Sequence, residues 1–226
     1  MDKTTKEKLK KSEKQYDRLH VDSGFSEEME SYEVVATLLK GKKAVDIGCG
    51  SGYMERLFPD DITGVDFSKE ALKIAKKNGA KHLVHAPAEN LPFKDNEFEI
   101  SASFGVLEHV VDQLKAVQEM ARVSKVQILI VHASLPYGLE LVRPFFAKLL
   151  GLKDQPIEKP FSMRKIKKMV KACGLKLVFQ GFWNYIDLRW IWKRLPYGLI
   201  KWPSCHLLVT IKSENINRVF MKGKKR

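Results

Sequence analysis

A group of glycines flanked by two acidic residues has the residue types and spacing that bind a nucleoside. Gly48, Gly50 and Gly52 follow a short apolar run. Asp46 lies just before them, and Asp66 follows Asp46 by 20 residues. Glycines tolerate positive φ angles and let a ligand approach the main chain closely, and a carboxylate can accept hydrogen bonds from both hydroxyls of a ribose. The pattern therefore predicts a loop that binds a nucleoside.

Two kinds of nucleoside compete for such a loop. A dinucleotide fingerprint reads G-x-G-x-x-G, but Tyr53 stands at the third glycine position and the spacing is G-x-G-x-G. Asp46 would repel a diphosphate, whereas it attracts the ammonium of an amino-acid moiety. No Gly-Lys-Ser/Thr follows the loop, which excludes a P-loop. We therefore expect S-adenosylmethionine (SAM) as the ligand.

Strand and helix patterns alternate around this loop and must position it. The run that ends at Ile47 is almost wholly apolar, as expected of a strand buried on both faces of a parallel sheet. Ser68 is suited to cap a helix, which leaves Asp66 available to a ligand. The alternation predicts an α/β fold with a doubly wound, mostly parallel sheet. We expect strands over 43–47, 62–65, 82–85, 98–104 and 126–132, and helices over 53–57, 68–77 and 114–123.

Further helices and strands are expected toward the two ends of the chain. The N-terminal segment is charged, with Tyr16 among its few apolar residues, and Tyr32 lies on the apolar face of a second helix. We expect helices over 3–20, 26–41 and 162–174, and two strands over 175–182 and 206–212 that complete a seven-stranded sheet.

A single domain accounts for residues 1–226. It comprises N-terminal helices in 1–42, a cofactor-binding half in 43–132 and a substrate-side half in 133–226. The three cysteines are far apart, the N-terminus has no apolar secretory region, and no apolar run reaches the roughly 18 residues that span a bilayer. We therefore expect a cytoplasmic protein.

Four motifs occur in the order found in a known family. Val45–Gly52 resembles the first motif of class I SAM-dependent methyltransferases, and Gly64–Ser68 resembles the second. Ala88–Phe93 is similar to the third, and Val106–Val110 to the segment after the fourth strand. The resemblance is closest to the small-molecule group that includes quinone and sterol-type enzymes. It implies a Rossmann-like methyltransferase fold with SAM as the cofactor.

The resemblance also assigns roles to residues of the loop. Gly48 and Gly50, with Cys49 between them, would pass under the methionine part of the cofactor. Asp66 would hold the ribose, and Phe67 would cover one face of the adenine.

The adenine edge departs from the family pattern. The backbone near Ala88 and Glu89 would read this edge, and Phe104 at the end of the fourth strand completes the expected cofactor set. The family often has an Asp before the Ala-Glu pair, where this chain has Pro87, which offers neither a side-chain acceptor nor an N–H. Adenine recognition is then looser, or it rests on Glu89.

His109 is the candidate catalytic residue. Its imidazole, with an ordinary pKa near 6.5, could take a proton from a hydroxyl substrate, or it could simply pack at the start of a helix. Quinone-pathway O-methyltransferases bind a divalent metal through a Glu-Val-Leu-Glu-His stretch. This chain keeps Glu108 and His109 but has Gly105 in place of the first Glu, so we expect no metal.

The net charge of +13 comes from the C-terminal part, because residues 132–226 carry 20 Lys or Arg against 5 Asp or Glu. The excess indicates an anionic partner or a solvated basic face. Two stretches, 139–150 and 188–195, carry apolar stripes, the second with Arg189, Lys193 and Arg194 beside it. They could form a helical lid over an apolar substrate, lie on an anionic membrane, bind RNA, or pack on the sheet.

Together these patterns lead to one preferred function and two alternatives. The preferred function is transfer of a methyl group from SAM to a small, apolar or amphipathic acceptor. The alternatives are an RNA methyltransferase that uses the basic C-terminal part, and a non-catalytic protein that binds the cofactor and a partner.

Overall fold

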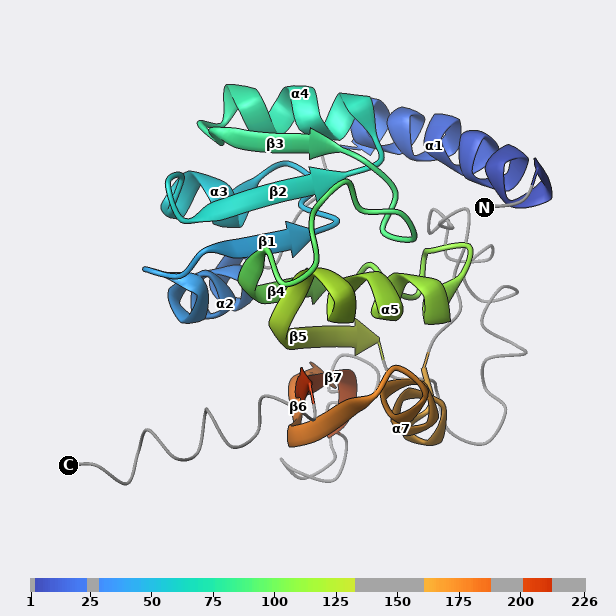
Figure 1. Ribbon diagram of the computed structural model, residues 1–226. Coiled ribbons are helices and arrows are strands. Elements are labelled where there is room, and N and C mark those ends of the chain that lie inside the picture. Colours follow the sequence, from blue (N-terminus) through green and yellow to red (C-terminus); the bar gives the residue numbers. More distant parts are fainter. Residues whose placement is uncertain (1–2, 24–28, 133–160, 188–200, 213–226) are drawn as a thin grey trace, which may run out of the picture.

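The computed structural model of the chain describes residues 3–23, 29–132, 161–187 and 201–212 (Figure 1). One sheet runs through this part, with helices on both of its faces. Among the described residues, no helix is both long enough and apolar enough to cross a membrane. The stripes predicted at 139–150 and 188–195 lie outside the described residues.

Seven strands form the sheet. They are β1 (Ala44–Ile47), β2 (Ile62–Asp66), β3 (His82–His85), β4 (Phe98–Phe104), β5 (Ser124–His132), β6 (Leu175–Asp187) and β7 (Lys201–Lys212). Their order in space is β3-β2-β1-β4-β5-β7-β6. Strands β1 to β5 pair in parallel, and β7 is antiparallel to both β5 and β6. The predicted doubly wound, mostly parallel sheet is confirmed.

The helices cover the two faces of this sheet. They are α1 (Lys3–Ser23), α2 (Met29–Leu39), α3 (Tyr53–Leu57), α4 (Lys69–Lys77), α5 (Gln113–Val123) and α7 (Met163–Ala172). Along β5, Leu129 and Val131 belong to the core that α5 and α7 close, while Ile128 and Ile130 belong to the core that α2 and α3 close. This period of two explains the almost wholly apolar strand sequences, because both faces are buried.

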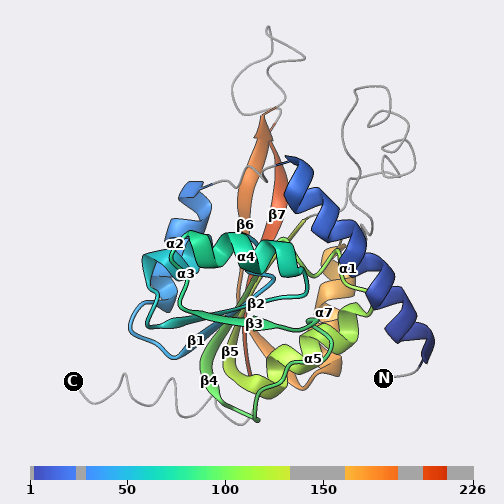
Figure 2. The ribbon, with the colours of Figure 1, turned by 90° about the horizontal axis from the view of Figure 1, so that it is seen from above.

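Strands β6 and β7 are longer than predicted. Their ladder continues past the predicted ends, through Trp183 opposite Cys205, to Asp187 opposite Lys201. Figure 2 shows the pair extending as a ribbon beyond the other strands. Residues 183–187 and 201–205, which lie outside the predicted strands, are therefore strand, and a bulge between Leu177 and Phe179 shifts the register of β6.

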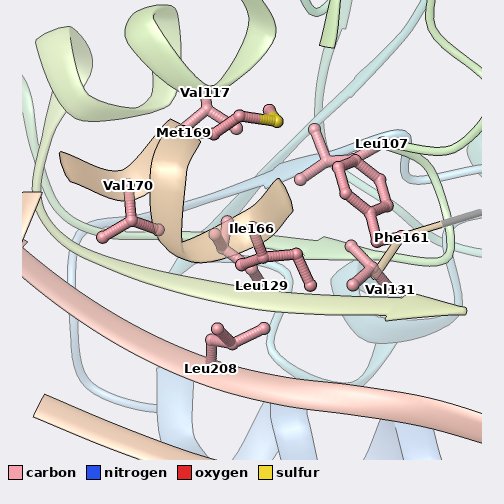
Figure 3. Close-up of a pocket in the computed structure, with 9 residues that line it drawn as sticks. All are labelled: Leu107, Val117, Leu129, Val131, Phe161, Ile166, Met169, Val170 and Leu208. Carbon is pink, nitrogen blue, oxygen red and sulfur yellow. The ribbon is translucent and has the colours of Figure 1, made fainter. Parts of the chain in front are cut away.

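Helix α7 closes the far end of the core, as its apolar spacing predicts. Ser162 caps it, with the Lys165 N–H donating to Ser162 Oγ at 3.3 Å, and Gly174 follows it with φ of 66°. Its inner face leaves a void of only about 10 Å³, roughly the size of one water molecule. The apolar lining of this void is too close-packed to admit a methyl acceptor. It consists of Leu107, Val117, Leu129, Val131, Phe161, Ile166, Met169, Val170 and Leu208 (Figure 3).

Candidate functional site

The glycine loop turns directly after β1, at the carboxyl end of the strand. Gly48, Gly50 and Gly52 have φ of 82°, 52° and 76°, values that side-chain-bearing residues rarely adopt. The N–H groups of Gly48 and Cys49 both donate to the Val65 carbonyl, at 2.7 and 3.0 Å. The loop is thereby held against the end of β2. Its backbone lies at the carboxyl ends of the strands, where open α/β folds bind ligands.

Two of the glycines are required by close packing as well as by φ. A Cβ on Gly48 would lie 2.2 Å from Cγ2 of Val106, which follows β4. A Cβ on Gly52 would lie 2.7 Å from the Cβ of Ala75 in α4. Gly52 therefore lets the loop pack against a helix, although it stands one position before the glycine that has this role in a dinucleotide fingerprint.

Asp66 ties the loop to the start of α4. Its Oδ2 accepts from the Gly50 N–H at 3.0 Å, and its Oδ1 accepts from the Ser68 N–H at 2.8 Å. Ser68 is the N-cap, as predicted, since its Oγ accepts from the Ala71 N–H at 3.1 Å. Asp66 is thus engaged with backbone rather than left open as the prediction had it, although a carboxylate can accept several hydrogen bonds at once.

Buried carboxylates surround the loop. Asp46, Glu55 and Asp66 are 2%, 0% and 8% exposed. Burial raises the pKa of the Cys49 thiol well above its usual value, and the negative charges of Glu55, Asp66 and Asp46 raise it further. Gly64 leaves room for this arrangement, because a Cβ there would meet Cys49 Sγ at 2.9 Å and Glu55 Oε1 at 3.0 Å. A buried region of negative potential favours a cationic ligand and opposes a diphosphate.

Helix α1 covers the part of the site beyond β2, which the sequence prediction did not include. Tyr16 is 8% exposed and meets two predicted site residues edge-on. Its ring centroid lies 5.2 Å from that of Phe67 and 6.2 Å from that of His109. The ring assigned to the adenine face and the candidate base are therefore both in contact with the N-terminal helix.

Polar contacts fix the position of α1. Asp17 Oδ1 accepts from Ser68 Oγ at 2.6 Å and from the Glu70 N–H at 3.2 Å. Glu13 lies 3.1 Å from His85 Nε2, and the same nitrogen lies 2.9 Å from the Phe67 carbonyl. The sequence carries one signal of this docking, because positions 13, 16 and 17 share a helix face.

Phe104 lies on a different side of the site from Phe67. Its ring stacks on that of Tyr32 in α2, with centroids 4.3 Å apart and planes 24° from parallel. Tyr32 also contacts Tyr53, whose hydroxyl donates to Glu33 at 2.9 Å. The two N-terminal helices thus each supply one tyrosine to an aromatic residue of the predicted site.

The residues assigned to the adenine edge are buried within the fold. Ala88 is 8% exposed and Glu89 is 3% exposed. Oε1 of Glu89 accepts from the Val111 N–H at 2.8 Å and the Asp112 N–H at 3.2 Å. Glu89 therefore supports the segment between β4 and α5. His109 lies in a turn of that segment rather than at a helix start, and its N–H donates to the Val106 carbonyl at 2.8 Å.

Glu55 is a buried carboxylate beside the glycine loop that the sequence analysis missed. Its signal is a carboxylate in the short helix after the loop, where Arg56 and Leu57 are exposed and Glu55 is buried. Within the described ranges, no three His, Cys, Asp or Glu side chains are grouped so that they could hold a metal ion.

Sequence comparison identifies relatives of the glycine-loop region. Residues 45–130 match the family model described as a methyltransferase domain. A demethylmenaquinone methyltransferase of Staphylococcus aureus (strain JH9) is 35% identical over 142 residues, which is 53% of this chain. The chain spans 58% of the length of that relative.

Solved structures of low sequence identity share the fold. YcgJ of Bacillus subtilis matches with a TM-score of 0.59 at 20% identity, over 81% of this chain and 98% of its own. The magnesium protoporphyrin IX methyltransferase of Synechocystis PCC 6803, solved with bound SAH, matches with a TM-score of 0.58 at 16% identity, over 82% of this chain and 83% of its own.

Proposed function

We propose that this chain, whose residues 45–130 match a methyltransferase domain, transfers a methyl group from SAM to a small, apolar or amphipathic acceptor. The observation that carries the proposal is the glycine loop, tied to α4 through Asp66 and set among buried carboxylates. The relative from Staphylococcus aureus bears the name of an enzyme that acts on a quinone, and an acceptor of that chemical class fits the proposal.

The residues around the loop are suited to SAM in charge. SAM carries an ammonium and a sulfonium, and it supplies a methyl group that the sulfonium charge already activates. When ionised, Asp46, Glu55 and Asp66 would provide a negative potential that favours these cations. Gly48 and Gly50 would support the methionine part, with Cys49 between them.

The nucleoside end would be held by the residues that the sequence assigned to it. The Asp66 carboxylate would take the ribose hydroxyls, and Phe67 would cover the adenine. The backbone at Ala88 and Glu89 would read the adenine edge, and Phe104 would close the side next to α2.

Aromatic residues from the N-terminal helices favour a small apolar acceptor. Tyr16 with Phe67 and His109, and Tyr32 with Phe104, form ring contacts that would exclude water from an acceptor bound beside them. Methyl transfer requires an in-line nucleophile and a dry site more than a dedicated catalytic group. His109 is placed beside these rings, where it would accept the proton of a hydroxyl acceptor.

Cofactor binding is the first test. Asp66→Ala should weaken SAM binding by about 1.5–3 kcal/mol, because a charged hydrogen-bonding partner is lost. Asp60→Ala is the matched control, since Asp60 lies at the opposite end of β2 and pairs with Lys81 on the surface. Calorimetric titration, with circular dichroism to verify folding, should show a loss in the first variant alone. Equal affinity of the two variants for SAM would contradict the site assignment.

The acceptor class is tested with radiolabelled SAM. The purified chain is incubated with a hydroxylated naphthoquinone in reduced form, a water-soluble catechol, or total RNA, and methyl label is followed into each. Label in the quinol that extracts into organic solvent is the expected result. Label in RNA alone would replace this proposal with an RNA methyltransferase, for which the cationic α7 is the favouring observation. SAM binding without label in any acceptor would favour a non-catalytic partner protein.

A further inference from the structure

The edge of the sheet formed by α7 and β6 combines uncompensated positive charge with exposed apolar side chains. The inner face of α7 is committed to the core, with Ile166 and Val170 only 3% and 4% exposed (Figure 3). The remaining face is cationic, because the helix contains five Lys or Arg and no Asp or Glu. All five are exposed, and four of them, Arg164, Lys167, Lys168 and Lys171, form the outer face.

None of these four side chains forms an ion pair with a carboxylate of the described ranges. The fifth cation, Lys165, donates to the side chain of Gln113 in α5 and lies over the ring of Phe161. The arrangement is unfavourable for the helix itself. Arg164 and Lys165 stand in the first turn, where the helix dipole opposes positive charge, and like charges recur at spacings of three and four. A negatively charged partner would relieve both effects.

Helix geometry directs most of these cations toward the sheet edge. Successive residues turn by about 100° around a helix. Lys165 marks the side toward α5, and Ile166 marks the side toward the sheet. Arg164, Lys167 and Lys171 therefore fall on the side away from α5. Because α5 packs on β4 and β5 whereas α7 packs on β6, that side faces the free edge of β6.

Strand β6 adds apolar groups to the same edge. It is the last strand of the sheet. Val178 and Phe179, at its bulge, are 41% and 52% exposed, and Lys176 is exposed as well. Phe179 stands opposite Val209 of the α2 core, so its side chain lies on the sheet face away from α7. The edge thus carries the helix cations on one face and an exposed aromatic side chain on the other.

We propose that this edge docks on the surface of an anionic lipid membrane. Basic side chains bind the lipid headgroups, while Val178 and Phe179 enter the boundary between headgroups and acyl chains. A nucleic acid would satisfy the cations but would leave the aliphatic Val178 in water, so lipid matches the whole surface better. The inference concerns a surface remote from the glycine loop and does not depend on methyl transfer.

The test is sedimentation of the full chain with vesicles. Binding to vesicles of 30% phosphatidylglycerol in phosphatidylcholine is expected, with little binding to phosphatidylcholine alone and a loss at high salt. The triple charge reversal R164E/K167E/K171E should weaken binding at least a hundredfold, since each cation near such a surface contributes about fivefold. Phe179→Ser should weaken it by a smaller factor that salt does not change.

The matched control reverses three lysines of α4, as K73E/K76E/K77E, with the same change in net charge. It should retain most of the vesicle binding, and SAM titration should show both charge variants to be folded. Equal losses of vesicle binding in the two variants would show that binding depends only on net charge, and would overturn the proposal. Tighter binding of a single-stranded RNA through the same three α7 residues would overturn it in favour of nucleic acid. A dimer that Phe179→Ser dissociates, with no vesicle binding, would assign the edge to a second copy of the chain.

Discussion

Helices α4 and α7 begin in the same way and differ in their charges. Each starts after a serine whose hydroxyl accepts an N–H three residues later, at Ala71 in one case and Lys165 in the other. Each turns a few apolar side chains inward and its lysines outward. The same local signals, a serine cap and a period near 3.6, therefore specify both helices.

The difference lies at the helix N-termini. Asp17, Asp66 and Glu70 all surround the start of α4, where the helix dipole favours negative charge, and lysines stand in its last turn. The start of α7 carries Arg164 and Lys165 instead. Charge supports the fold at α4, next to the glycine loop. At α7 charge opposes the helix, which indicates selection for something other than stability.

The largest expected difference between the two regions comes from their glycines. Gly52 and Gly174 share a positive φ, 76° and 66°, but only a Cβ at Gly52 would collide with a neighbour, at 2.7 Å from Ala75 of α4. Gly52→Ala should lower the free energy of unfolding by about 3 kcal/mol, from backbone strain and overpacking together. Gly174→Ala, which follows α7, should cost about 1 kcal/mol. Urea denaturation measures both, and equal costs would show that the α4 contact is not tight.

Replacing the two serine caps should give a smaller difference in the free energy of unfolding. Ser68 is fully buried and also donates to Asp17, whereas Ser162 is exposed. Ser68→Ala should cost about 2 kcal/mol, at the upper end for a cap, and Ser162→Ala about 0.5 kcal/mol. Thermal and urea unfolding of the two variants check this order. If Ser162 proved the more important cap, the contrast between the helices would fail.

Charge changes at the first turns should have the smallest effects, with opposite signs. Glu70→Lys should destabilise the chain by about 0.5 kcal/mol, because it opposes the dipole and removes the pair with Lys73. Arg164→Glu should stabilise it by about the same amount. Denaturation at low salt is the measurement, and both effects should shrink in 0.5 M salt. Destabilisation by Arg164→Glu would mean that Arg164 supports the fold, contrary to the role proposed for α7.

The fold was predictable because its elements are local. Apolar strands, the serine caps and the glycine loop all lie within short windows, and the structure places each where the pattern indicates. The site was predictable only in part. Asp66 and the glycines follow from spacing, but the contacts of α1 join residues far apart, 51 positions for Asp17 and Ser68 and 72 for Glu13 and His85. The periodicity of apolar residues within one segment does not predict such long-range pairs.

Two other differences between the prediction and the structure also arise from contacts between distant segments. The buried position of Glu55 depends on the space that Gly64 leaves in a neighbouring strand. The added length of β6 and β7 arises because each strand supplies the other with backbone partners beyond the sheet. Both depend on pairing that a single segment does not reveal.

The link between Asp17 and Ser68 has a consequence for the timing of the reaction. Because α1 rests on Phe67 and Ser68, beside the residues assigned to the nucleoside, under the proposed function its opening would break two Asp17 hydrogen bonds and expose that end of the site. Such local openings need far less free energy than global unfolding. In enzymes of this kind the release of product, rather than the chemical step, often limits turnover. In the proposed enzyme, the rate at which α1 opens would then set the rate of turnover.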